Sequence, residues 1–199
     1  MIGGSPGSPV FRKIDLLMLR VLLVAVALVL GSSIVAVAGP DDDARAAIEA
    51  MKRADWGTAA GLWTRVIDSG RLGNRQLVPA YGNRATCYTK LEKWIEALAD
   101  FSKSIELAPG SNYPPKYVAY SYSNRAAAYI KLKRYELAIQ DADQAVRLND
   151  RDHVAYYNRG RARKALGRRE AAIADFRAAL GIEPNHQGSR RALQSLGVQ

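Results

Sequence analysis

Small and aromatic residues recur between residues 78 and 186 at spacings that place them on one face of a helix. In three segments a tyrosine precedes a small residue by four positions, and a leucine follows it after six. Residues three or four positions apart share a helix face, which predicts amphipathic helices over about residues 79–91, 118–132 and 153–166. The small residues are Ala85, Ala126 and Gly160. We expect them where two helices cross, because large side chains there would hold the backbones apart.

A second predicted helix follows each of these after a short turn. Each has an alanine, then Phe or Ala four positions later, then Ser or Ala three positions further on. The alanines are Ala97, Ala138 and Ala172. The pattern predicts helices over about residues 94–107, 135–148 and 169–182. One such hairpin cannot bury its apolar stripe alone, so neighbouring hairpins are expected to stack.

The three helix pairs form an internal repeat. Asn-Arg followed by a small residue begins at Asn83, Asn124 and Asn158, with spacings of 41 and 34 residues. A seven-residue insertion, within the stretch SNYPPKY, accounts for the longer spacing. Pro109 and Pro184 end two of the units. A 34-residue unit with these small, aromatic and proline positions resembles the tetratricopeptide repeat (TPR).

The resemblance implies an all-α, right-handed superhelix of stacked antiparallel helix hairpins. The three clear repeats are expected at residues 78–111, 119–152 and 153–186. Residues 39–77 are expected to form a degenerate helical hairpin, because Ala47, Ala59 and Trp63 take the positions of core residues. Residues 187–199 are expected to contain a capping helix with a polar outer face.

Residues 1–38 have the pattern of a secretory signal peptide. Ten apolar residues from Val21 to Leu30 follow three basic residues, and Ala36 and Ala38 form a small-x-small cleavage site. We therefore expect an exported protein, periplasmic or secreted, with translation starting at Met1 or at Met18. The alternative is an inner-membrane anchor, since the stretch that ends at Ala38 has 18 residues, the short edge for crossing a bilayer.

Composition narrows the function classes. The 199 residues are 48% hydrophobic, which suits one folded domain. The single cysteine, Cys87, excludes an intrachain disulfide and a Cys-based zinc site, and is expected to be a small buried residue. His153 and His186 lack the spacing of a metal site. No phosphate loop, nucleophile elbow or carboxylate pair occurs outside the repeat, so we predict no enzyme activity, no metal and no cofactor.

Positive charge is concentrated in the second half of the chain. Residues 41–110 hold ten basic and ten acidic residues, whereas residues 111–199 hold 16 basic and 8 acidic ones. Six basic residues occur together without an acid, at Arg159, Arg161, Arg163, Lys164, Arg168 and Arg169. They form either a solvated face balanced by Glu170 and Asp175, or a cationic surface for an acidic peptide or an anionic envelope surface. The chain has no nucleic-acid-binding motif, so nucleic acid is not expected as a partner.

The family resemblance implies that the first helices of the pairs line a concave groove for a protein or peptide. The three asparagines fall beside this groove. Their amides either bind a peptide's backbone or terminal carboxylate, or form hydrogen bonds within the stack and space adjacent repeats. The arginine after each asparagine, at Arg84, Arg125 and Arg159, is expected to pack its stem on the helix and send its head group to water.

The carboxylate clamp of co-chaperone family members is not expected in this chain. Asn124 matches one clamp position. The third repeat, however, has Val154 and Asn158 where the clamp needs Lys and Arg, and the first repeat has Gly82 and Thr86 in place of Lys and Asn.

We therefore predict a non-enzymatic adaptor that binds a partner protein or peptide, of acidic character if the cationic surface takes part. The predicted contacts are Asn83, Tyr120, Asn124, Lys131, Tyr157, Asn158, Arg161 and Lys164. The alternatives are a self-assembling scaffold and a membrane-anchored protein that binds anionic envelope surfaces.

Overall fold

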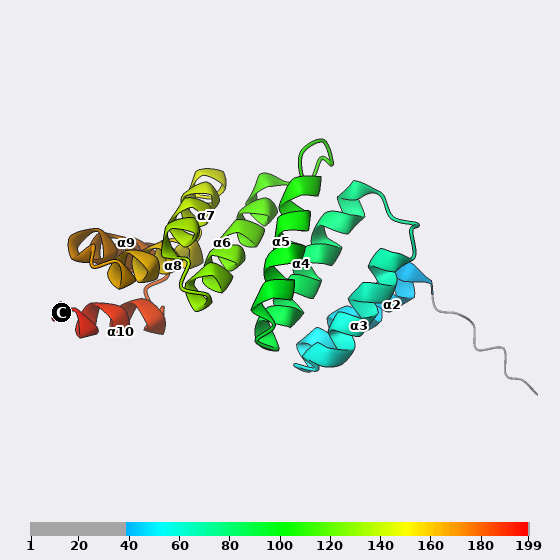
Figure 1. Ribbon diagram of the computed structural model, residues 1–199, viewed down its shortest axis with the longest axis horizontal. Coiled ribbons are helices and arrows are strands. Elements are labelled where there is room, and N and C mark those ends of the chain that lie inside the picture. The colour runs from blue at the N-terminus through cyan, green and yellow to red at the C-terminus, as the bar shows by residue number, and fades with distance from the viewer. Residues whose placement is uncertain (1–38, 199) are drawn as a thin grey trace, which may run out of the picture. The chain divides into compact units, whose positions relative to one another are not determined.

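The computed structural model describes residues 39–198, so the expected signal peptide or anchor lies outside the described residues. The described part contains nine helices (Figure 1). Four pairs occur in chain order: α2 (Pro40–Lys52) with α3 (Trp56–Asp68), α4 (Asn74–Lys90) with α5 (Trp94–Leu107), α6 (Pro115–Lys131) with α7 (Tyr135–Leu148), and α8 (His153–Ala165) with α9 (Arg169–Ile182). A single helix, α10 (Gln187–Ser195), follows them. The predicted all-α fold of stacked hairpins is confirmed.

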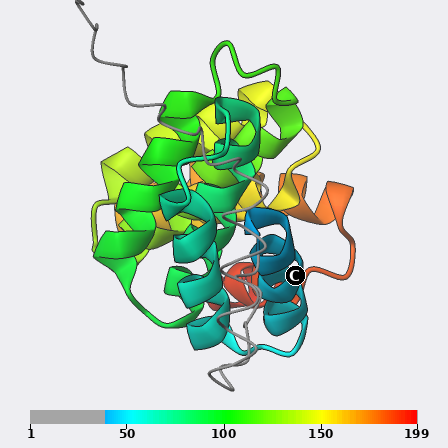
Figure 2. The ribbon, with the colours of Figure 1, turned by 90° about the vertical axis from the view of Figure 1, so that its right-hand side faces the viewer.

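The helices stack so that the first member of each pair contributes to one face. The two helices of a pair pack together, and each second helix packs on the first helix of the next pair. The first helices also touch one another, α4 with α6 and α6 with α8. We call the face formed by α2, α4, α6 and α8 the inner face. The loop between α5 and α6 protrudes beyond the helix ends in both ribbon views (Figures 1 and 2).

Small residues let the two helices of a pair approach closely. Ala85 and Ala126 are completely buried against the second helices of their pairs. Gly160 takes this place in the third repeat, where an added Cβ would lie 2.7 Å from the ring of Phe176. The crossing positions predicted from the sequence are therefore buried at the contact between the two helices of each hairpin.

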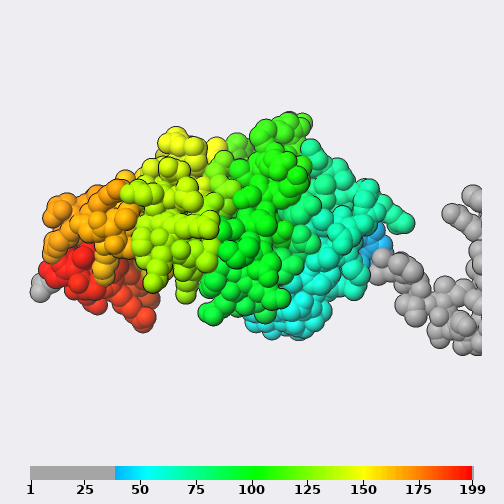
Figure 3. All heavy atoms as spheres, in the orientation of Figure 1, coloured from blue at the N-terminus to red at the C-terminus, as the bar shows by residue number. Residues whose placement is uncertain are grey.

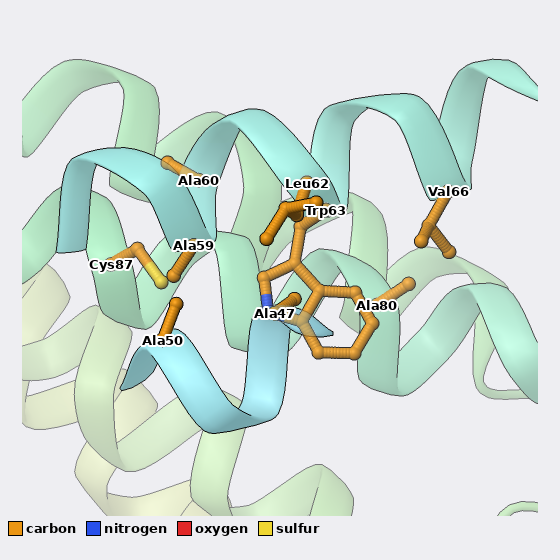
Figure 4. Packing of buried hydrophobic residues seen from close by; sticks show 9 residues of the cluster. All are labelled: Ala47, Ala50, Ala59, Ala60, Leu62, Trp63, Val66, Ala80 and Cys87. Atoms are coloured by element: carbon orange, nitrogen blue, oxygen red, sulfur yellow. The ribbon is translucent and has the colours of Figure 1, made fainter. Parts of the chain in front are cut away.

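The degenerate first hairpin has a core of the same kind. Ala47 of α2 and Ala80 of α4 lie beside the indole of Trp63, and Cys87 of α4 lies next to Ala50 and Ala59 (Figure 4). The Trp63 Nε1 group donates a hydrogen bond to the Met51 sulfur at 3.3 Å. Cys87 is completely buried, as expected, and burial raises the pKa of its thiol to about 11.

The second helices of the three clear repeats have the predicted bounds, but two of the first helices begin earlier than predicted. Helix α4 starts at Asn74, so Asn74 to Gln76 form its first turn, and Pro79 lies inside the helix. Helix α6 starts at Pro115, where the fixed φ of proline suits the first helical position. Of the helices within residues 39–198, none is both long and apolar enough to cross a bilayer.

Candidate protein-binding face

The recurring arginine joins the two helices of its own pair and the pair before it. Arg125 donates from Nε and Nη2 to the two Asp141 oxygens at 2.7 and 2.8 Å, and from Nη1 to Ser102 Oγ of the preceding pair at 2.9 Å. Arg84 forms the same three bonds with Asp100 and Thr64. The prediction that these head groups reach water is wrong, because the two arginine side chains are only 14% and 16% exposed.

Two tyrosine rings flank each of these guanidinium groups. The Arg125 guanidinium carbon lies 5.5 Å from the ring centroid of Tyr122 and 5.8 Å from that of Tyr129. Arg84 has the same arrangement with Tyr81 and Tyr88. These distances suit cation–π attraction, which adds to the ion pair. The arginine of the repeated Asn-Arg motif is therefore a packing residue in these two repeats.

The third repeat has a larger version of this network. Arg159 bonds to Asp175 at 2.7 Å and to Asp143 of the preceding pair at 2.6 Å. Arg163 replaces the second tyrosine and donates to the other Asp175 oxygen at 2.9 Å. Of the six clustered basic residues, Arg168 pairs with Glu136 and Arg169 donates to the Leu196 carbonyl. Within the described residues, three members of this group have no ion pair: Arg161, Lys164 and Arg169.

Two adjoining depressions on the inner face have tyrosine walls. Their volumes are about 400 and 610 Å³, and both are lined by Pro79, Tyr113 and Tyr117. The smaller one is also lined by Asn83 and Tyr120, and the larger one extends to residues of α2 and α3. We call the two together the aromatic groove. Its lining offers mainly apolar surface with a few hydroxyl and amide groups, and the charged residues Asp41 and Arg75 line the larger depression. This mixture suits the side chains of an extended peptide.

A third depression, of about 570 Å³, lies between α8 and α10. Its cationic residues are Arg161 and Lys164 of α8 and Arg191 of α10, and its lining residues include no acid. Its other residues are mostly apolar or aromatic, among them Ile130, Tyr157 and Phe176. We call this depression the cationic pocket. In the space-filling view, α10 (red) lies next to α9 (orange) at one end of the array (Figure 3).

The structure places the predicted contact residues in several different environments. Asn83 and Tyr120 line the aromatic groove, and Tyr157, Arg161 and Lys164 line the cationic pocket. The other three, Asn124, Lys131 and Asn158, line neither of these depressions. The Nδ2 group of Asn124 donates to the Tyr120 carbonyl at 2.8 Å, and the Lys131 ammonium lies 5.2 Å from the Trp94 ring centroid.

Asn158 is almost completely buried between two repeats. Its Nδ2 group donates to the Ser123 carbonyl of α6 at 3.0 Å, and its Oδ1 atom accepts from Arg161 at 3.4 Å. This geometry favours the interpretation that the asparagine spaces adjacent repeats. A role for any of the eight residues in binding a partner stays a prediction.

Sequence reasoning missed three residues that line these depressions. Tyr113 and Tyr117 lie in or next to the insertion, which was interpreted only as a break in the repeat period. A pair of tyrosines around two prolines was the available signal. Arg191 of α10 was assigned only to the capping helix. The available signal was the adjacent pair Arg190 and Arg191 in a helix of nine residues.

The two histidines, 33 residues apart in sequence, lie side by side. Their ring centroids are 5.3 Å apart. The Nδ1 atom of His186 accepts a hydrogen bond from the Ser189 amide at 3.3 Å, so His186 is the N-cap of α10. Burial, reinforced by the charge of His153, lowers the pKa of His186. Within the described residues, no group of three or more His, Cys, Asp or Glu side chains is placed to hold a metal ion.

Comparison with known proteins identifies the repeat. Two family models, both described as tetratricopeptide repeat, match residues 76–151 and 153–186. The TPR domain of Arabidopsis OM64 is 30% identical, with a TM-score of 0.58, over 63% of this chain and 98% of that domain.

Two further solved structures are similar to this chain. The second TPR domain of human RPAP3, in complex with the HSP70 peptide SGPTIEEVD, is 27% identical over 64% of this chain and all of that domain, with a TM-score of 0.56. The Cut9 and Hcn1 hetero-tetramer of the APC/C matches 80% of this chain and 30% of the solved chain at 16% identity, with a TM-score of 0.72. That last likeness concerns the fold alone.

Proposed function

Because the chain belongs to the tetratricopeptide repeat family, we propose that it is a non-enzymatic interaction module that binds an extended segment of a partner protein along its inner face. One observation carries the proposal: three depressions lie along the inner face and continue to α10, and their lining is mainly aromatic, apolar and cationic. Such surfaces bind peptides by placing successive side chains in separate pockets.

The internal ion pairs support this assignment. The arginines of the repeated motif and their aspartates satisfy one another between the helices. They are therefore not available for a partner. The exposed aromatic residues are available, since Tyr117 and Tyr120 are 49% and 46% exposed. Aromatic residues of this kind supply much of the binding energy at protein interfaces.

The related RPAP3 domains indicate the kind of ligand but not its identity. They bind acidic peptides from HSP90 and HSP70. This chain has Val154 and Asn158 at two positions where the clamp for such peptides needs cations, and Asn158 is buried. We propose a partner whose contacts with the inner face differ from those of the clamp.

We also propose that the protein acts outside the cytoplasm. The order of basic, apolar and small residues in residues 1–38 supports export. Cell fractionation and N-terminal sequencing would test this. Cleavage before Gly39 would support the signal peptide, whereas a precursor retained in the cytoplasm would contradict export.

Site-specific photo-crosslinking tests the inner-face assignment. A photoreactive phenylalanine analogue replaces Tyr120 on the inner face or, as the control, Gln140, an exposed residue of α7. The full chain is produced in its own cells, and adducts are mapped by mass spectrometry. We expect position 120 to react with an extended segment of one partner and position 140 to give no such adduct. The same partner at both positions, or only at position 140, would overturn the proposal.

A further inference from the structure

We propose that helix α10 is part of the binding site, and that with α8 it forms a pocket for an acidic segment of the partner, in which carboxylates flank an apolar side chain. This proposal rests on the proposed function and names the chemistry of one end of the inner face. A capping helix is expected to present a polar surface to water. Here α10 also contributes Arg191 to a depression that contains two cations of α8.

The charge of the cationic pocket is not balanced by the described part of the protein. Arg161, Lys164 and Arg191 line it, none of them forms an ion pair within residues 39–198, and none of the lining residues is acidic. The neighbouring arginines at positions 159, 163 and 168 all have carboxylate partners. Three cations around one depression raise the local concentration of anions and favour an acidic ligand.

The pocket is held in shape before any ligand binds. The guanidinium of Arg161 lies 5.5 Å from the ring centroid of Tyr157 and bonds to the buried Asn158. The ammonium of Lys164 lies 2.5 Å from Ser195 Oγ on α10. Gly188 of α10 is so close to Tyr157 that an added Cβ would lie 2.8 Å from its ring. A preorganised site loses less conformational entropy when it binds.

The apolar part of the pocket favours a peptide over a bare anion or a membrane surface. Ile130, Tyr157 and Ala192 are partly exposed beside the cations, so an aliphatic side chain and its neighbouring carboxylates can be bound together. Arg161 is only partly exposed, because its head group lies over a tyrosine ring inside the depression. A flat layer of lipid headgroups reaches such a recessed cation less well than a flexible peptide does.

Fluorescence anisotropy with two synthetic peptides tests the proposal on the full chain. The probe is a fluorescein-labelled peptide with three acidic residues on each side of a leucine. The control peptide, called the amide twin, has the same sequence with Asn and Gln in place of Asp and Glu. The variants are Arg161→Glu and Arg191→Glu. The matched control is Arg177→Glu, which makes the same charge change at an exposed residue of α9 that does not line the pocket.

We expect the acidic peptide to bind the wild type and Arg177→Glu equally. Each pocket variant should weaken binding about fivefold to tenfold, and Arg191→Lys should retain most of it. Binding should also weaken as NaCl rises from 50 to 300 mM, because salt screens exposed charges.

Three outcomes would overturn the pocket: equal binding of the amide twin, an equal loss in Arg177→Glu, or binding only to vesicles that contain anionic phospholipid. The inner-face adduct at position 120 separates the two proposals. If it persists while the peptide result is negative, the pocket assignment fails and the proposed function stands. If it is absent, the proposed function fails.

Discussion

The ion pair between Arg125 and Asp141 gives the strongest prediction about stability. Asp141→Leu removes a carboxylate whose side chain is 7% exposed and leaves a guanidinium that is 16% exposed. The two lost bonds, at 2.7 and 2.8 Å, involve charged groups worth about 1.5–3 kcal/mol each, and breaking a buried pair typically costs about 3–5 kcal/mol. We expect the free energy of unfolding to fall by about 3–5 kcal/mol, a large part of the stability of an ordinary domain.

Urea unfolding followed by circular dichroism measures this loss, and a double variant controls for it. Arg125→Met/Asp141→Leu removes both charges and keeps the volume similar. Burial already raises the pKa of Asp141 despite the opposing bonds from Arg125, which shows that the pair is costly to desolvate. The double variant should therefore lose about 2 kcal/mol or less. A loss below about 1 kcal/mol in the single variant, or an equal loss in both, would refute the argument.

Three further predictions concern the core and α10. Cys87 should resist iodoacetamide at pH 8 in the folded protein and react fully in urea, because its thiol is buried with a pKa of about 11; rapid labelling of the native chain would contradict this. Gly188→Ala should push α10 away from Tyr157 at a cost of about 1 kcal/mol or more, seen as faster trypsin cleavage within α10 than in the wild type. The lowered pKa of His186 means that the unfolded chain binds the proton more tightly. Stability should therefore be constant above about pH 7.5 and fall below pH 6.5. In the variant His186→Asn, which keeps an N-cap residue, the melting temperature should depend less on pH across that range than in the wild type.

The regular spacing of the small residues was enough to predict that each of the three clear repeats contains two helices. The bounds of α5, α7 and α9 follow from the sequence because an alanine and an aromatic or small residue recur at fixed positions in each. The starts of α4 and α6 do not, because the turns before Pro79 and at Pro115 lie outside the repeated pattern.

The buried ion pairs were present in the sequence but were not recognised. An aspartate follows each repeated arginine after 16 residues, at Asp100, Asp141 and Asp175. Charge alone suggests exposure, and only the crossing geometry of the hairpin shows that the two groups meet. Arg191 was not recognised as a binding residue for a similar reason. Helix α10 lies outside the repeat, so the repeat spacing does not show that α10 lies beside α8.

The third bond of each arginine has a consequence for the length of the stack. Each arginine donates its third bond to a side chain on the second helix of the preceding pair. The acceptors are Thr64, Ser102 and Asp143. Ser102 and Asp143 come two residues after the paired aspartates Asp100 and Asp141, and Thr64 comes two residues after Leu62, which takes the aspartate's position in α3. The equivalent position in α9, two residues after Asp175, holds Arg177. An additional hairpin of the same kind would bring its own arginine against this cation, and the two would repel. The bond that joins each arginine to the preceding pair therefore has no side-chain acceptor at the equivalent position of α9.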